Sequence, residues 1–191
     1  MASRTLQQVL TIAGSDSGGG AGIQADIKSM SANGVFAMSV ITAVTAQNTE
    51  DVTDVFELPT SIIASQLDAV FDDFDVAAVK TGMLSSTAIV ELVAKMLAIQ
   101  KVANLVVDPV MVSKSGHALL KPDAIDALKK LLFPLALVVT PNIHEAQQLS
   151  GLAIANLADA RRAAKIIHGF GPKYVLIKGG HLLAERATDL L

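Results

Sequence analysis

The sequence predicts an α/β fold in which a mostly parallel central sheet lies between two layers of helices. Short runs rich in valine, isoleucine and leucine alternate along the chain with segments of helical periodicity, which is the pattern of repeated βαβ units. These runs are continuously apolar, as expected for parallel strands that are buried on both faces. Apolar residues make up 51% of the chain and charged residues only 17%, which favours the same interior sheet. The length of 191 residues predicts a single domain over residues 1–191.

The predicted strands and helices follow one another in alternation. Strands are expected at residues 8–14, 38–46, 76–82, 104–110, 135–141 and 174–180. Helices are expected to begin at Ile23, Thr60, Ser86, Pro122, Ile143 and Leu157. Right-handed crossovers between such strands give a parallel sheet with helices on both faces. The segment 48–59 fits neither pattern and is expected to form a small ribbon at the edge of the sheet.

Composition excludes several classes of function. The formal net charge of −3, without a basic cluster, argues against a nucleic-acid partner, because neutralising phosphates needs a surplus of lysine and arginine. The absence of cysteine excludes disulfides, thiolate metal sites and cysteine nucleophiles within this sequence, and it favours a cytoplasmic location. The longest uncharged apolar run, residues 131–143, is too short to span a membrane, and we expect no membrane partner.

Polar side chains stand at the carboxyl ends of the predicted strands, where open parallel sheets bind their ligands. They are Asp16, Gln47, Asn48, Lys80, Thr81, Asp108, Asn142, Glu145 and Lys178. Carboxylates, amides and lysines along one edge suit Mg²⁺ and phosphate groups better than zinc. Structural roles are the alternative: Asn142 and Glu145 have the spacing of a helix capping box, and both lysines could extend into solvent.

A glycine-rich stretch follows the first predicted strand, with five glycines among residues 14–22. Such runs mark places where the backbone must approach a neighbour closely or adopt positive φ angles. The stretch is not a Walker A loop, because Gly20 stands where that motif has its lysine. A dinucleotide fingerprint fits Gly20, Gly22 and Ala25 only in part, because the second predicted strand does not end in an acid. We interpret the glycines as allowing close approach to a small flat ligand or a neighbouring strand, with a purely structural turn as the alternative.

Six segments occur in a fixed order between about residue 9 and the C-terminus. They are AGSDSGGGAGIQADIK, TAQN, KTGM, VVDPVMVSKSG, TPNIHEA and LIKGGH. In this combination the chain resembles the hydroxymethylpyrimidine and phosphohydroxymethylpyrimidine kinases of thiamine biosynthesis, in the ribokinase-like superfamily. The resemblance implies a ribokinase-like fold and a homodimeric transferase. The implied reaction is the ATP- and Mg²⁺-dependent phosphorylation of 4-amino-5-hydroxymethyl-2-methylpyrimidine and of its monophosphate.

The resemblance also assigns residues to the pyrimidine. Gln47 would hydrogen-bond the aminopyrimidine, since an amide both donates and accepts. Gly22, Met83 and Val110 would wall the ring, and Asp26 would support the pocket as a further substrate-binding residue.

The phosphate groups are assigned to the opposite part of the edge. The resemblance implies that Asp108 and Glu145 organise Mg²⁺, partly through water, and that Asn142 binds the nucleotide. Lys178 would bind the nucleotide as well and act catalytically by neutralising the charge on the transferring phosphoryl group. Phosphoryl transfer depends mainly on positioning and charge stabilisation, so these residue types suit it.

The chain departs from the family pattern near its end. The family has a G-T-G-[CD] turn that supplies an anion hole and the catalytic base, and no such motif occurs here. We therefore expect a domain that is C-terminally incomplete relative to the family. The alternatives are a pyridoxal kinase on the same scaffold, a catalytically silent pyrimidine-binding fragment and, more distantly, a dinucleotide oxidoreductase.

Overall fold

The structure is a computed structural model that describes residues 6–111, 120–179 and 188–191. Its strands are β1 (Gln8–Asp16), β2 (Phe36–Gln47), β3 (Val52–Glu57), β4 (Val76–Thr81), β5 (Leu105–Val107), β6 (Val138–Val139) and β7 (Tyr174–Val175). Its α-helices are α1 (Gly22–Ala32), α2 (Thr60–Asp73), α3 (Thr87–Ile99), α4 (Pro122–Ala127), α5 (Ile143–Ser150) and α6 (Leu157–His168). The predicted alternation of strands and helices is confirmed.

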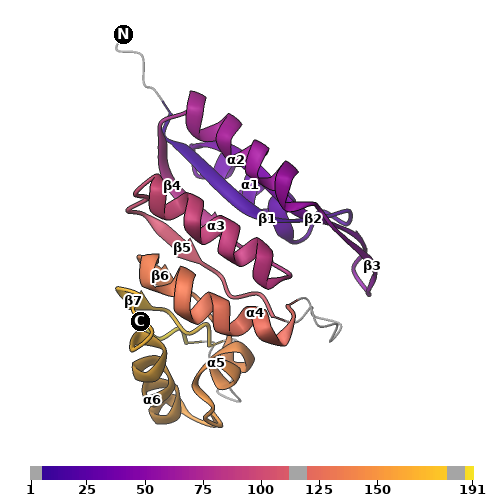
Figure 1. Cartoon of the computed structure of the whole chain (residues 1–191). Coiled ribbons are helices and arrows are strands. Elements are labelled where there is room, and N and C mark those ends of the chain that lie inside the picture. The colour runs from indigo at the N-terminus through magenta and orange to yellow at the C-terminus, as the bar shows by residue number, and fades with distance from the viewer. Residues whose placement is uncertain (1–5, 112–119, 180–187) are drawn as a thin grey trace.

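These strands form one sheet in the order β3-β2-β1-β4-β5-β6-β7, and all neighbours are parallel except β2 and β3. The connection from β1 to β2 runs in one direction along the sheet, whereas those from β2 to β4 and from β4 to β5 run in the other. Right-handed crossovers therefore place α1 on one face and α2 and α3 on the opposite face, as Figure 1 shows. This arrangement is the predicted α/β fold, and the reversal at β1 opens a crevice between β1 and β4.

The edge ribbon predicted for residues 48–59 is also present. Strand β3 pairs antiparallel with the end of β2, so that Val44 lies opposite Phe56 and Thr45 opposite Val55. Polar and charged residues separate the apolar ones here, which is why the segment lacked the continuous apolar run of a buried strand.

The last three strands are shorter than the sequence predicts, and β5 covers only Leu105–Val107 of the predicted run 104–110. Strand β6 covers only Val138–Val139 and β7 only Tyr174–Val175, although the predicted runs were 135–141 and 174–180. Pro141 ends β6, because proline has no backbone N–H for the ladder. Beyond β7 the pairing continues only as isolated bridges, one of which joins Asn142 to Lys178. Gly180 lies outside the described residues, as do residues 112–116 and His181 of the quoted motifs.

The hydrophobic core lies between the sheet and its helices. Strand residues such as Leu10, Ile12 and Val107 are fully buried. Helix residues spaced three or four apart, such as Ile63 with Leu67 on α2, turn the same face of their helix inwards. Among the described residues, none of the helices combines the length and the apolar character needed to cross a bilayer.

The glycine-rich stretch forms a tight loop between β1 and α1. Gly22 has a φ of 56°, and a Cβ atom there would overlap the carbonyl oxygen of Gly14. Only glycine fits this position, because it tolerates a positive φ and leaves room for the neighbouring backbone. The close approach to a neighbouring strand, one of the two interpretations of the glycines, is thus present at Gly22.

We expect Gly22→Ala to lower the free energy of unfolding by about 3 kcal/mol, the sum of a left-handed backbone penalty and overpacking. Gly34→Ala is the matched control, because Gly34 also has a positive φ (76°) but a Cβ there meets nothing within 4 Å. The control should lose only the backbone penalty, about 1 kcal/mol. Urea unfolding of both variants measures the difference. Equal losses would mean that the contact with β1 does not constrain the loop.

Candidate active site

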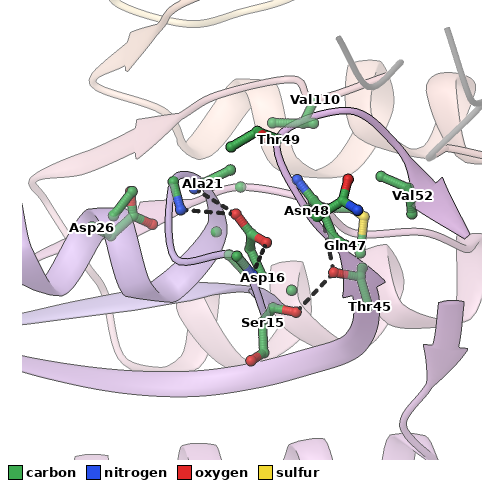
Figure 2. Close-up of a pocket in the computed structure, with 18 of the residues that line it drawn as sticks. Ser15, Asp16, Ala21, Asp26, Thr45, Gln47, Asn48, Thr49, Val52 and Val110 are labelled. Atoms are coloured by element: carbon green, nitrogen blue, oxygen red, sulfur yellow. Dashed lines mark hydrogen bonds between the residues drawn. The ribbon is translucent and has the colours of Figure 1, made fainter. Parts of the chain in front are cut away.

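A cavity of about 480 Å³ lies at the carboxyl ends of the strands, where the loops after β1, β2, β4 and β5 meet (Figure 2). Its volume lies in the range of small-molecule binding sites. The residues assigned to the substrate all line it: Gly22, Asp26, Gln47, Met83 and Val110. Asp108 lines the same cavity. The sheet thus gathers residues that are far apart in the sequence around one space.

The glycine loop that borders this cavity is organised by Asp16 at the end of β1. One carboxylate oxygen, Oδ1, accepts a hydrogen bond from Gly18 N (2.7 Å). The other, Oδ2, accepts from Gly20 N (3.0 Å) and Ala21 N (2.8 Å), as Figure 2 shows. The backbone N–H of Asp16 itself donates to Gln24 Oε1 (2.8 Å), which ties the loop to α1. Hydrogen bonds within the chain therefore fix the shape of the loop.

The side chain of Gln47 lies at the cavity beside the end of β2. Its Oε1 lies 3.1 Å from Thr45 Oγ1, which is also within hydrogen-bond distance (3.0 Å) of the Ser15 carbonyl. The backbone of Gln47 is bonded to the loop: Ser17 Oγ accepts from Gln47 N (2.8 Å) and donates to Gln47 O (2.7 Å). Two neighbours thus hold Gln47 at the edge of the cavity that it lines.

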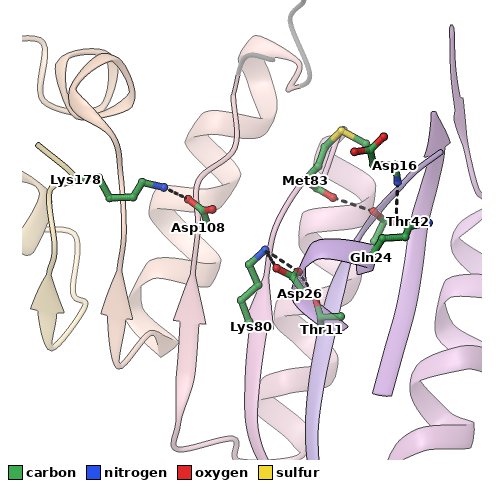
Figure 3. A network of polar contacts seen from close by, with 9 residues as sticks. All are labelled: Thr11, Asp16, Gln24, Asp26, Thr42, Lys80, Met83, Asp108 and Lys178. Carbon is green, nitrogen blue, oxygen red and sulfur yellow. Dashed lines mark hydrogen bonds and ion pairs between the residues drawn. The ribbon is translucent and has the colours of Figure 1, made fainter. Parts of the chain in front are cut away.

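A partly buried ion pair lies where α1 packs on the paired strands β1 and β4. Lys80 Nζ lies 2.8 Å from Asp26 Oδ2 and 3.1 Å from Oδ1, and Thr11 Oγ1 donates to Oδ2 at 2.6 Å (Figure 3). The three residues come from β4, α1 and β1, so the pair joins a helix to two adjacent strands. Lys80 does not extend into solvent, which had been the structural alternative for this lysine, because its side chain is only 21% exposed.

A second ion pair marks the other end of the site. Lys178 Nζ lies 2.8 Å from Asp108 Oδ1, and Figure 3 shows the Lys178 side chain reaching across the intervening β6 segment to Asp108 at the end of β5. Lys178 is brought there by its bridge to Asn142 and by a hydrogen bond from its N–H to Pro141 O. The lysine side chain is 41% exposed, so it can reach a ligand that enters from solvent.

Asn142 and Glu145 form the capping box that their spacing predicts, at the start of α5. Asn142 Oδ1 accepts from Glu145 N (2.9 Å), and Glu145 Oε2 accepts from Asn142 N (2.8 Å). Burial raises the pKa of the Glu145 carboxyl, and the hydrogen bond from the Asn142 backbone partly opposes the rise. The nearby Asp108 carboxylate raises this pKa further, whereas Lys178 lowers it. Glu145 therefore caps the helix and also faces the Asp108–Lys178 pair.

The carboxylates of Asp108 and Glu145 suit a Mg²⁺ ion that takes its other ligands from water and from substrate phosphates. Among the described residues, no group of three or more histidine, cysteine, aspartate or glutamate side chains could hold a metal ion by itself. Asp108 and Glu145 supply two carboxylates that lie close enough to affect one another's charge. Mg²⁺ is commonly held by one or two carboxylates together with waters and substrate phosphates, and this pair matches that pattern.

Sequence reasoning did not assign several residues that shape the site. Ser17 and Thr45 hold Gln47, and Thr11 holds Asp26 together with Lys80. Periodicity could have found one of them, Thr45, which lies two residues before Gln47 in β2, because residues spaced by two share a face of a strand. Thr11 and Lys80 are register partners of adjacent strands, which only the pairing reveals.

The chain shares its fold with solved structures of phosphomethylpyrimidine kinase and pyridoxal kinase, which places it in the class of ribokinase-like small-molecule kinases. The family model described as phosphomethylpyrimidine kinase matches residues 16–191. The chain belongs to the phosphomethylpyrimidine kinase family. It is 54% identical over 183 residues to a hydroxymethylpyrimidine/phosphomethylpyrimidine kinase of Streptomyces coelicolor, which covers 96% of this chain and 67% of that protein.

Solved structures show the same fold. The crystal structure of phosphomethylpyrimidine kinase from Clostridium difficile 630 superposes with a TM-score of 0.88 at 52% identity, over 96% of this chain and 79% of that one. The pyridoxal kinase of Staphylococcus aureus in complex with AMP-PCP and pyridoxal has a TM-score of 0.88 at 38% identity, over 97% of this chain and 67% of that one. The fold class and the family resemblance are confirmed.

The raised pKa of Glu145 makes its effect on stability depend on pH. A carboxyl whose pKa is higher in the folded than in the unfolded state binds a proton more readily in the folded protein. At neutral pH the ionised Glu145 carboxylate therefore destabilises the fold. This destabilisation becomes smaller as the pH falls through the raised pKa towards about 4.3, the pKa of an unperturbed glutamate.

As the pH is lowered from 7 to 5, we expect the free energy of unfolding of the parent chain to rise relative to that of Glu145→Gln. Glutamine keeps the acceptor for Asn142 N–H but cannot titrate. Urea unfolding from pH 7 to 5 in EDTA measures the difference. A difference that is constant with pH, or that falls, would contradict the raised pKa.

Proposed function

We propose that this protein catalyses the ATP-dependent phosphorylation of 4-amino-5-hydroxymethyl-2-methylpyrimidine and of its monophosphate, in thiamine biosynthesis. One observation carries the proposal: a single cavity joins a ring-sized pocket beside Gln47 to the carboxylate of Asp108, which is paired with Lys178. The proposal is supported by the match to the phosphomethylpyrimidine kinase family over residues 16–191.

The pocket beside Gln47 suits an uncharged heterocycle. The free part of the Gln47 amide faces the cavity and can pair with a ring nitrogen or an amino group. Met83 and Val110 offer apolar surface to the faces of a ring, and Gly22 lines the same cavity. Asp26 is held by Lys80 and Thr11, and it lines the same cavity as Asp108.

The opposite end suits phosphoryl transfer. We assign Asp108 and Glu145 to Mg²⁺, Asn142 to the nucleotide, and Lys178 to the nucleotide and to the charge that develops on the transferred group. When bound, Mg²⁺ would neutralise charge on the nucleotide phosphates. Lys178 can leave Asp108 and turn to a phosphate at small cost, because a pair this exposed contributes only about 1 kcal/mol or less.

Pyridoxal phosphorylation is the second candidate. It is favoured by the 38% identity and the TM-score of 0.88 to the Staphylococcus aureus pyridoxal kinase, which was crystallised with AMP-PCP and pyridoxal. Pyridoxal is also a flat heterocycle with a hydroxymethyl group, so the same cavity could hold it. The family match and the 54% identity to the Streptomyces coelicolor enzyme favour the pyrimidine.

We further propose that the chain forms a homodimer through the edge of the sheet that β3 provides. Phe56 is 64% exposed, and its cross-strand partner Val44 is 45% exposed on the same face. An exposed strand edge with apolar side chains favours pairing with another chain. A second copy of this chain presents the same edge, so a two-fold symmetric contact would cover both.

We place the protein in the cytoplasm, in keeping with the absence of cysteine and with ATP as phosphate donor. The net charge of −3 favours small-molecule partners over nucleic acid. No G-T-G-[CD] motif occurs in the sequence, so the tests below measure binding and not turnover.

We expect Gln47→Ala to raise the dissociation constant of 4-amino-5-hydroxymethyl-2-methylpyrimidine about tenfold, because the variant loses hydrogen bonds to the ring. Asp108→Asn is the matched control: it should bind the pyrimidine as the parent does but lose the thermal stabilisation by Mg²⁺ and ATP. Isothermal titration calorimetry and thermal shifts measure both. If the two variants lose both ligands equally, the pocket has been misassigned.

The same thermal-shift assay separates the candidate substrates. The pyrimidine should stabilise the parent chain more than pyridoxal at equal concentration. Stronger stabilisation by pyridoxal would favour the second candidate, and stabilisation by NAD alone would reject a kinase.

We expect Phe56→Ser to shift the sedimentation coefficient of the chain from that of a dimer to that of a monomer, because the substitution places a polar group in the proposed contact. Tyr174→Ser is the control, since Tyr174 is 46% exposed on β7 at the far edge of the sheet. Analytical ultracentrifugation over a range of concentrations measures both. A monomeric parent chain, or a Phe56→Ser dimer as stable as the parent, would refute the proposed interface.

A further inference from the structure

Asp16 is a buried carboxylate that the proposed reaction does not use. The residue is only 5% exposed, yet among the described residues no lysine, arginine or histidine forms an ion pair with it. Its two oxygens instead accept three hydrogen bonds from the backbone N–H groups of Gly18, Gly20 and Ala21. Backbone dipoles alone therefore balance its charge.

Converging backbone N–H groups in a glycine turn form a concavity that binds anions in many proteins. Here the concavity lies immediately before α1, whose N-cap residue Ala21 has no side-chain acceptor of its own. The chain fills the concavity with the Asp16 side chain. A phosphate group has no place in this loop while Asp16 occupies it, which distinguishes it from the phosphate-binding glycine loops that it resembles in composition.

The filled loop is in turn coupled to Gln47. A Cβ atom on Gly18 would lie 3.2 Å from Asp16 Oδ1 and 3.2 Å from the carbonyl oxygen of Gln47, so the loop packs closely between the two residues. Ser17, the neighbour of Gly18, exchanges hydrogen bonds with both backbone groups of Gln47. Asp16 thus fixes the loop, and the loop fixes the strand end that carries the Gln47 amide.

We propose that Asp16 is a positioning residue: a built-in anion that holds the glycine loop closed, places Gln47 for the ring, and keeps phosphate groups out of the loop. A monophosphate substrate can then lie in only one direction, with its ring at Gln47 and its phosphate towards Asp108 and Lys178. The identity of the ring rests on the proposed function. The filled loop does not, because it is defined by contacts within the chain.

Two variants test the proposal against a matched control. Asp16→Asn keeps the shape of the side chain but turns an NH₂ group towards a backbone N–H, so the loop can no longer close on all three bonds. Asp16→Ala empties the concavity, which then has room for formate, the smallest carboxylate. Asp54→Asn is the control, because Asp54 is an exposed residue on β3 whose carboxylate accepts a hydrogen bond from the N–H of Val55.

The first measurement compares two ligands. Asp16→Asn should raise the dissociation constant of 4-amino-5-hydroxymethyl-2-methylpyrimidine about tenfold, because the displaced loop shifts Gln47. Its thermal stabilisation by Mg²⁺ and ATP should not change, and Asp54→Asn should match the parent chain for both ligands. Unchanged pyrimidine binding by Asp16→Asn would overturn the proposal. So would equal loss of both ligands, since that indicates general damage to the fold.

The second measurement uses formate and does not depend on the pyrimidine. Formate at tens of millimolar should raise the melting temperature of Asp16→Ala but not of the parent chain or of Asp54→Asn. It should also shift the amide resonances of Gly18, Gly20 and Ala21 in the variant. An equal effect of formate on all three proteins, or none on Asp16→Ala, would overturn the proposal.

The two measurements also separate this proposal from the proposed function. If the parent chain binds no pyrimidine, the proposed substrate is wrong, and the formate arm still decides the role of Asp16. If Asp16→Ala does not fold, amide spectra of Asp16→Asn decide in its place: changed resonances of Gly18, Gly20 and Ala21 support the proposal, and unchanged ones overturn it.

Discussion

The site depends on one constraint, the parallel alignment of all the strands except β3. Parallel strands end at the same edge, so the residues that follow them meet there although they are far apart in the sequence. The strand order reverses at β1, and the helices that follow β1 and β4 therefore leave on opposite faces of the sheet. The cavity at this edge is lined by the Asp26–Lys80 pair, by Gln47 and by Asp108. A ligand bound there would contact the loops after four different strands.

Charges in the site are balanced in three ways that differ in how readily they can change. Asp16 is bonded to backbone groups that cannot leave, and the Asp26–Lys80 pair is largely buried and also held by Thr11. Separating that pair would leave two charges in a poorly solvated crevice. The Asp108–Lys178 pair is the most exposed of the three, so its partners can exchange for a metal ion or a phosphate. The groups that can exchange lie at the end assigned to phosphoryl transfer, and the fixed groups lie at the end assigned to the ring.

The sequence predicts the fold well because continuous apolar runs and helical periodicity are local signals. It predicts the capping box of Asn142 and Glu145 for the same reason, since both partners lie within one turn. The lengths of β6 and β7 were not predictable, because they depend on where neighbouring strands stop pairing. The bonds of Ser17 with Gln47 and of Asp26 with Lys80 were missed because they join residues 30 or more positions apart.

Glycine content alone does not tell what a loop binds. In a phosphate-binding loop the backbone N–H groups stay open, and the ligand supplies the negative charge. In this chain the same kind of backbone is closed by an aspartate two to five residues before the amides that it accepts from, as Asp16 is before Gly18 and Ala21. An acid at the start of a glycine-rich turn therefore changes the expected ligand from an anion to an uncharged group. The local spacing of Asp16 to its glycines carries this information, so the distinction can be drawn from sequence once the contact is known.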